Sequence, residues 1–191
     1  SSATVRALAS GACVLASGPG TGGAPSGAIL VPHLTRDIRP MSDARAFFEI
    51  LRLLIKIQPA VLHTHTSKAG FLGRWAGWAL NQTAFRKKPV RLVHTPHGHV
   101  FYGYFGPAKS LLFRWLEALS AWITDELVAV SEGERRESLE RGVGRPGQWA
   151  VIAAAFEGAF PESSAGAARR EVLQSFGVPV EALLFGTVAR L

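Results

Sequence analysis

Histidine is the residue type whose placement in this chain most clearly suggests chemistry. Five of the 6 histidines lie in two short clusters, His63-Thr64-His65 and His94-Thr95-Pro96-His97-Gly98-His99. Each cluster directly follows a short apolar run, and open α/β sheets bind ligands at the carboxyl ends of their strands. Imidazole titrates near neutral pH, hydrogen-bonds to sugars and phosphates, and ligates metals. The two clusters therefore predict one ligand site at the ends of two neighbouring strands.

The chemistry of the first cluster has two interpretations. Strand alternation points the imidazoles of His63 and His65 to one face, where they could bind zinc with a third ligand from the second cluster. No cysteine or carboxylate lies nearby in the sequence, however. We therefore expect no metal here, and expect one packed histidine and one at the ligand edge of the sheet.

The second cluster also leaves two alternatives open. Gly98 permits a backbone turn that a side chain would obstruct, which lets His97 approach a bound sugar closely. A purely structural histidine is the other interpretation.

Two predicted helix starts carry polar residues, and the first of them suits an anion. Thr66-Ser67-Lys68-Ala69-Gly70 offers free backbone N–H groups, hydroxyls and an ammonium group, although helix capping explains Ser67 equally well. Ser131-Glu132-Gly133-Glu134 is a predicted capping box. We interpret Glu132 and Glu140 as part of a solvated face with ion pairs.

The elements that position these residues follow from the alternation of short apolar runs with helical patterns. This alternation predicts an α/β fold, with a mostly parallel sheet covered by helices on both faces. The expected strands are 13–17, 29–31, 60–64, 90–95, 126–130, 149–153 and 184–188. The expected helices are 43–57, with Ser42 as its N-cap, 68–80, 108–123, 132–141 and 167–176.

The expected helix 108–123 has an apolar face and a basic face. Its apolar residues include Leu111, Leu112, Trp115, Leu119 and Trp122, and its basic residues are Lys109 and Arg114. Such a helix could lie on an acidic membrane surface. Packing of the apolar face on the sheet is the alternative that we favour.

Composition sets further bounds. The chain of 191 residues has a net charge of +7, which favours an anionic partner. No block of five like charges occurs, so a nucleic-acid-binding tail is not expected. The single cysteine, Cys13, excludes an internal disulfide and suits a reducing compartment. No apolar stretch is long enough to predict a membrane span.

Several segments match, in order, the motifs of one known family. They are Val61-Leu62-His63-Thr64-His65-Thr66-Ser67-Lys68-Ala69-Gly70 with Gly73-Arg74, Val93-His94-Thr95-Pro96-His97-Gly98, Leu116-Glu117 with Thr124-Asp125, Val128-Ala129-Val130-Ser131-Glu132 with Arg135-Arg136, and Gly186-Thr187-Val188-Ala189-Arg190-Leu191. Together they resemble the N-terminal domain of family 4 glycosyltransferases of the GT-B fold, over nearly the whole chain from Met41.

The resemblance implies a retaining glycosyltransferase of the hexosyltransferase type, with two Rossmann-like halves. The nucleotide-sugar would be a co-substrate, and no cofactor and no metal are expected. By motif position, His97 is the implied catalytic residue, which hydrogen-bonds to the donor sugar and stabilises its cationic transition state. Arg190 is implied to contact the donor diphosphate. The implied substrate-binding residues are His65, Ser67, Lys68, Gly98, Ser131, Arg135 and Arg136.

The same resemblance implies the domain organisation. Residues 1–180 would form the acceptor-binding domain, and residues 181–191 would begin the donor-binding domain. The family's first strand and its glycine-rich loop are expected to precede residue 1, so we expect a fragment that is inactive alone. The sequence departs from the family at Ala153-Ala154-Ala155-Phe156-Glu157, where only Glu157 keeps an acidic residue at the expected place.

The implied partners are a nucleotide-sugar donor and a glycan or polyprenyl-phosphate-linked acceptor, and no nucleic acid. The implied location is the cytoplasm, with peripheral contact at the inner membrane surface left open. Two other functions stay open. One is a sugar-nucleotide epimerase of the same architecture, and the other is a non-catalytic module that binds a glycan or lipid phosphate.

Overall fold

The structure is a computed structural model that describes residues 13–19, 27–83, 88–96 and 107–153, with positions 170 and 174. The chain divides into two compact units, residues 1–154 and residues 155–191. The predicted strand 184–188, and all of the predicted helix 167–176 except positions 170 and 174, lie outside the described residues. The predicted domain boundary at residue 180 stays a prediction.

Two parallel sheets form the first unit. The larger has four strands in the order β3 (Val61–His65), β4 (Arg91–Thr95), β5 (Glu126–Ala129) and β6 (Trp149–Val151). Val61 pairs with Arg91 and His65 with Thr95, so β3 and β4 end level with each other. A smaller sheet pairs β1 (Ala16–Ser17) with β2 (Ile29–Leu30). The predicted α/β class and the parallel sheet are confirmed.

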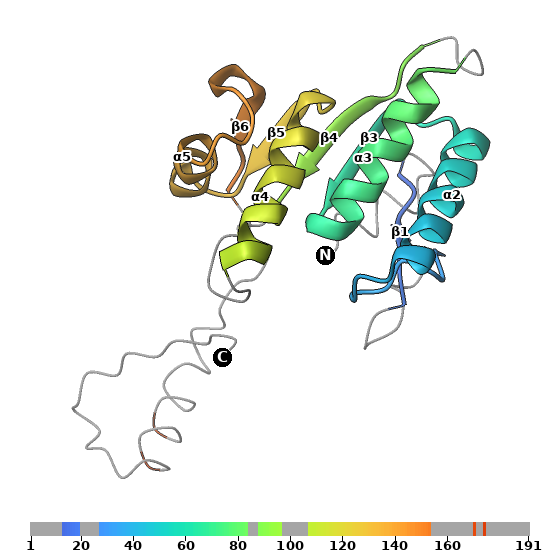
Figure 1. Ribbon diagram of the computed structural model, residues 1–191, viewed down its shortest axis with the longest axis horizontal. Coiled ribbons are helices and arrows are strands. Elements are labelled where there is room, and N and C mark those ends of the chain that lie inside the picture. The colour runs from blue at the N-terminus through green and yellow to red at the C-terminus, as the bar shows by residue number, and fades with distance from the viewer. Residues whose placement is uncertain are drawn as a thin grey trace. The chain divides into compact units, whose positions relative to one another are not determined.

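The helices connect successive strands, as parallel pairing requires. They are α2 (Pro40–Ile57), α3 (Ser67–Asn81), α4 (Pro107–Trp122) and α5 (Glu132–Glu140), with a short 3₁₀ turn, η1 (Pro146–Gln148), before β6. Figure 1 shows α3 and α4 side by side along the four-stranded sheet, with α2 beyond α3. The sequence predicts helices on both faces of the sheet. In the described residues, α3, α4 and α5 lie against one face of the four-stranded sheet.

The first helix begins earlier than predicted. It starts at Pro40 with Arg39 as the N-cap, because the fixed φ of proline suits the first helical position. Ser42 is therefore inside α2, and its hydroxyl donates to the carbonyl of His33 at 3.0 Å. The C-terminus is as predicted, with Gln58 in the left-handed region just before Pro59.

Two apolar clusters hold the layers together. The first joins α2 and α3 to the end of β2 through Val31, Ile50, Leu54, Leu72 and Leu80. The second joins α4 to β5 and β6 through Ala121, Leu127, Ala129, Val143 and Trp149. Leu127 and Trp149 are partners across adjacent strands, so they point to the same face of the sheet.

The packing of α4 differs from the favoured expectation. Its large apolar residues, Leu111, Leu112, Trp115, Leu119 and Trp122, are exposed, and Trp122 is 87% exposed. Glu117, Ser120 and Ala121 are buried instead. The expectation that the apolar face packs on the sheet is wrong, because α4 meets its neighbours through polar and small residues that have polar partners there.

Candidate functional site

The carboxyl ends of β3, β4 and β5 form one edge of the larger sheet. His65 is the last residue of β3, and Ser131 follows β5 by two positions. Helices α3 and α5 also begin at this edge, since α3 follows β3 and α5 follows β5. Two helix N-termini and two predicted ligand residues therefore share an edge, and helix N-termini favour anions.

His63 and His65 point to the same face of β3, as strand alternation predicts. Their rings lie 4.4 Å apart between centroids, and the Nε2 of His63 is 2.9 Å from the Oγ1 of Thr95 on the neighbouring strand. Both side chains are exposed. The expectation that one of the two is packed is therefore wrong, because helix α3 covers the opposite face of β3, where Thr64 and Leu62 lie.

The helix start at α3 differs in detail from its prediction. The N-cap is Thr66, not Ser67, and Thr66 has a φ of 63° and makes no side-chain capping bond. A positive φ is costly for a β-branched residue, and such strain tends to persist at functional positions. Sequence patterns gave no signal for this strained position between His65 and Ser67.

Lys68 is already engaged within the chain. Its ammonium group is 2.5 Å from the Asp43 carboxylate of α2, and it also donates to the backbone carbonyl of Asp37. Its positive charge is therefore shared with an acidic neighbour, which reduces its attraction for a ligand anion. Its proposed role in substrate binding stays a prediction.

The start of α5 is as predicted at its N-cap, but the predicted capping box is only half formed. Ser131 is the N-cap, its Oγ accepts from the backbone N–H of Glu134 at 3.1 Å, and Glu134 accepts from the N–H of Val130. Arg135 pairs with Glu132 at 2.8 Å, and Arg136 is exposed. The Ser131 hydroxyl is thus engaged as an acceptor within the helix start, and Arg136 carries an exposed side chain on the same helix.

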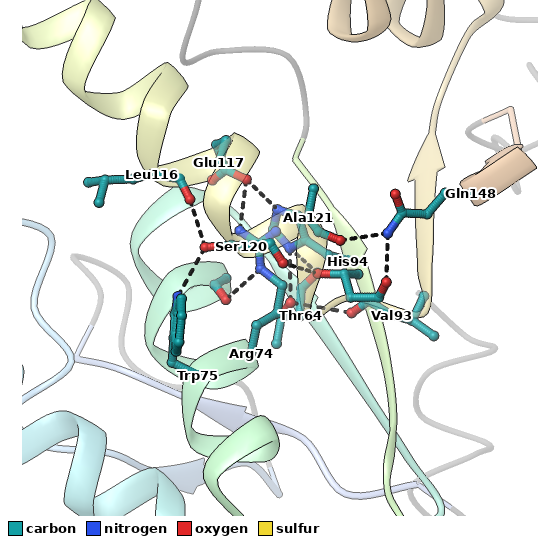
Figure 2. Close-up of polar contacts among 12 residues, drawn as sticks. Thr64, Arg74, Trp75, Val93, His94, Leu116, Glu117, Ser120, Ala121 and Gln148 are labelled. Carbon is teal, nitrogen blue, oxygen red and sulfur yellow. Dashed lines mark hydrogen bonds and ion pairs between the residues drawn. The ribbon is translucent and has the colours of Figure 1, made fainter. Parts of the chain in front are cut away.

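A buried polar cluster lies beneath this edge, between the sheet and the helices α3 and α4 (Figure 2). The Nη2 of Arg74 on α3 is 2.7 Å from the Oε2 of Glu117 on α4, and both side chains are buried. His94 of β4 lies against them, with its Nε2 3.7 Å from the same carboxylate oxygen. Arg74 and Glu117 belong to the family motifs, but their contact was not predicted because 43 positions separate them.

His94 is electrically neutral in this cluster. Burial, reinforced by the positive charge of Arg74, lowers the pKa of His94 from 6.5 to about 2. Its Nδ1 lies 3.1 Å from the Thr64 carbonyl, which can only accept, and 2.9 Å from the Thr64 hydroxyl, which can accept or donate. The 3.7 Å approach to Glu117 is therefore no ion pair. Burial also raises the pKa of Glu117, which Arg74 opposes.

Three predicted site residues, His97, Gly98 and Arg190, lie outside the described residues. Among the residues that are described, no three His, Cys, Asp or Glu side chains gather closely enough to hold a metal ion. A groove between β2 and α2 is lined by Leu30, Glu49, Arg52 and Lys56, and no predicted site residue lines it. Within the described ranges, none of the helices has the length and apolarity needed to cross a membrane.

The family model of the glycosyl transferase 4-like domain matches residues 3–155, and the chain belongs to this family.

A curated relative is the UDP-Gal:alpha-D-GlcNAc-diphosphoundecaprenol alpha-1,3-galactosyltransferase of Escherichia coli, 31% identical over 108 residues. The match covers 56% of this chain and 26% of that protein.

Two solved structures are similar to parts of the chain. One is the UDP-GlcNAc 2-epimerase from Methanocaldococcus jannaschii, at 16% identity and a TM-score of 0.46, covering 67% of this chain and 31% of that one. The other, from Listeria monocytogenes, is assigned as a UDP-N-acetylglucosamine 2-epimerase, at 13% identity and a TM-score of 0.48. It covers 81% of this chain and 46% of its own.

Proposed function

We propose that this chain is the acceptor-binding part of a retaining glycosyltransferase. The enzyme moves a hexose from a nucleotide-sugar donor to a lipid-linked or polysaccharide acceptor. One observation carries the proposal: family motifs that are far apart in the sequence end at a single edge of a parallel sheet. The relative, whose acceptor is linked to diphosphoundecaprenol, supports a polyprenyl-diphosphate acceptor. Action at the cytoplasmic face of the membrane is part of the same proposal.

The chemistry proposed for this edge is electrostatic. Ser131 and Arg136 bind the acceptor, with Arg135, His65, Ser67, Lys68 and Gly98 as further contacts. His97 hydrogen-bonds to the donor sugar and stabilises its developing positive charge, while Arg190 neutralises the leaving diphosphate. Preorganised groups of this kind stabilise a transition state without a metal ion. The nucleotide-sugar is consumed as a co-substrate.

The test joins residues 1–191 to a donor-binding domain and follows transfer of labelled galactose from UDP-galactose to GlcNAc-diphosphoundecaprenol. We expect an α-linked product, which indicates retention, and we expect His97→Ala to lower kcat/KM by about a hundredfold or more. His33→Ala is the matched control, because His33 pairs with Glu49 in the middle of α2 and has no proposed role at the edge.

Other outcomes overturn parts of this proposal. An unchanged kcat/KM for His97→Ala would contradict the catalytic role of His97. A β-linked product would contradict the retaining mechanism. An epimerised nucleotide sugar formed without acceptor indicates the epimerase. Tight binding of polyprenyl phosphate with no transfer indicates a non-catalytic module.

A further inference from the structure

Helix α4 presents its apolar residues to solvent. Leu111, Trp115, Leu119 and Trp122 recur at spacings of three and four, which places them along one side of the helix, with Leu112 beside them. We call these five residues the α4 stripe. All five are exposed, Trp115 by 69% and Trp122 by 87%. Isolated exposed apolar side chains are ordinary, but a continuous stripe with two tryptophans indicates a contact surface.

Contacts on the inward side of α4 determine that the α4 stripe faces solvent. Glu117 is paired with Arg74 at 2.7 Å, and the Nε1 of Trp75 donates to Ser120 at 3.2 Å. At the C-terminus, the Nε2 of Gln148 donates to the carbonyls of Ala121 and Thr124 at 2.7 and 2.6 Å. Rotating the helix to bury the α4 stripe would break these buried contacts. The stripe is therefore held outward by the same polar groups that join α4 to the rest of the unit.

The charges beside the α4 stripe indicate which kind of partner could cover it. Within the described part of α4, the acidic residue is Glu117, which is buried and paired, whereas Arg114 is exposed next to Trp115. The whole chain carries a net charge of +7. The outward side of α4 thus combines tryptophan, leucine and an exposed arginine, and the helix carries no exposed carboxylate in its described part. Such a combination suits an anionic bilayer, where indole rings settle at the headgroup level.

A second copy of the chain fits the α4 stripe less well. A stable protein interface involves roughly 20–30 residues on each side, whereas the stripe has five on one helix. Two stripes meeting face to face would also bring two Arg114 side chains together.

We propose that the α4 stripe docks the protein on the surface of an anionic lipid bilayer, with α4 parallel to the membrane plane. Trp115 and Trp122 enter the headgroup region, and Arg114 contacts lipid phosphates. Helix α4 begins at the carboxyl edge of the sheet and ends at the opposite edge, since it connects β4 to β5. Docking along α4 therefore places the carboxyl edge, where acceptor binding is proposed, at one end of the membrane-bound helix, while His65 points to the opposite face of the sheet. This last consequence rests on the proposed function, whereas the docking itself does not.

The experiment measures binding of the full chain to vesicles by flotation, without donor or acceptor. Vesicles of phosphatidylglycerol with phosphatidylcholine are compared with vesicles of phosphatidylcholine alone. We expect binding to the anionic vesicles that weakens as salt is added. Because no substrate is present, a failure of binding would contradict the docking proposal and leave the transferase proposal standing.

The key variant is Trp115→Glu/Trp122→Glu, and its matched control is Phe48→Glu/Ile55→Glu. The control residues are also exposed, lie on α2, and are likewise seven positions apart. We expect the α4 variant to lose about tenfold or more of its binding, and the control to stay within about twofold of wild type. Far-ultraviolet circular dichroism melts show whether both variants fold.

A second measurement does not depend on those variants. Bromine-labelled phosphatidylglycerol should quench the tryptophan fluorescence of the wild type, and Trp115→Phe/Trp122→Phe should remove most of the quenching while binding persists. Equal losses in both glutamate variants, or quenching that survives Trp115→Phe/Trp122→Phe, would overturn the proposal. So would a dimer that only the α4 variant dissociates, because the stripe would then be covered by a second copy.

Discussion

His94 is placed where its imidazole cannot readily accept a proton. The charged and titratable groups that influence it are Arg74, Glu117, His65 and His63. Arg74 disfavours a second positive charge, and burial disfavours any charge. In the unfolded chain the same histidine has a pKa near 6.5. The folded and unfolded states therefore bind different numbers of protons in mild acid.

The consequence is a predictable pH dependence of stability. Because the folded pKa of His94 is about 2, the unfolded state binds more protons below about pH 6.5, and the free energy of unfolding falls as pH falls. Between about pH 7 and about pH 5 this contribution is about 2 kcal/mol. Urea unfolding at both pH values should show that His94→Asn loses less stability in this interval than wild type.

The raised pKa of Glu117 acts in the opposite direction, because the folded state binds a proton more readily there. The contribution of Glu117 is the same in wild type and in His94→Asn as long as the surroundings of Glu117 do not change. The difference in pH dependence between the two proteins therefore reports on His94. Equal losses of stability in the two proteins would mean that His94 does not carry the pH dependence.

The Arg74–Glu117 pair allows a second test with single residues. Removing one partner leaves a buried charge without compensation, so Glu117→Leu should lower the free energy of unfolding by about 3–5 kcal/mol. Arg74→Met/Glu117→Leu removes both charges and should be more stable than Glu117→Leu alone. Urea unfolding at neutral pH measures both, and a double variant that is weaker than the single one would contradict this account.

At the scale of elements, the glycines of α3 set how closely this helix approaches the sheet. A Cβ atom at Gly73 would lie 2.8 Å from the Cγ2 of Thr64, and one at Gly77 would lie 2.5 Å from a methyl group of Leu92. A Cβ at Gly70 would overlap the ring of His94. In the sequence Gly70 and Gly73 belong to family motifs, and in the structure they allow close packing of α3 against β3 and β4.

This close packing predicts that a larger residue at these glycines lowers the free energy of unfolding. Gly73→Ala should lower the free energy of unfolding by about 1–3 kcal/mol, because the methyl group must displace Thr64 or the helix. Gly133→Ala is the matched control in α5, where the nearest atom to the new Cβ is 3.7 Å away. There the better helix propensity of alanine should leave stability unchanged or slightly raised. Thermal melts of both variants measure the difference, which should vanish if α3 can move away freely.

At the scale of the whole molecule, the sequence predicts the order and type of the elements well. The strand 60–64 is observed as β3 and the strand 90–95 as β4, each within one residue. These predictions succeed because each strand is a short apolar run that polar or turn-forming residues bound on both sides. The N-cap bond predicted at Ser131 is confirmed for a similar reason, since its partners are three residues apart. The reciprocal bond of the predicted capping box is not observed, because Glu134 accepts from the N–H of Val130 rather than from that of Ser131.

What could not be predicted depends on contacts between distant segments. The pairing of Arg74 with Glu117 decides which side of α4 faces inward, and the periodicity of α4 carries no information about that partner. Likewise, nothing local indicates that Asp43 of α2 takes the ammonium group of Lys68. The sequence therefore predicts which residues lie at this edge. It does not predict the ion pairs that some of them make within the chain.

The register of the larger sheet also has a consequence for synthesis in the cell. Val61 pairs with Arg91, so a strand must wait for 30 further residues before its neighbour leaves the ribosome. Chains elongate at roughly 5–20 residues per second, and the backbone of β3 therefore stays unpaired for a few seconds. During that interval the nascent chain is open to chaperones and to other nascent chains, and the helix α3, made in between, is the first partner that can shield it.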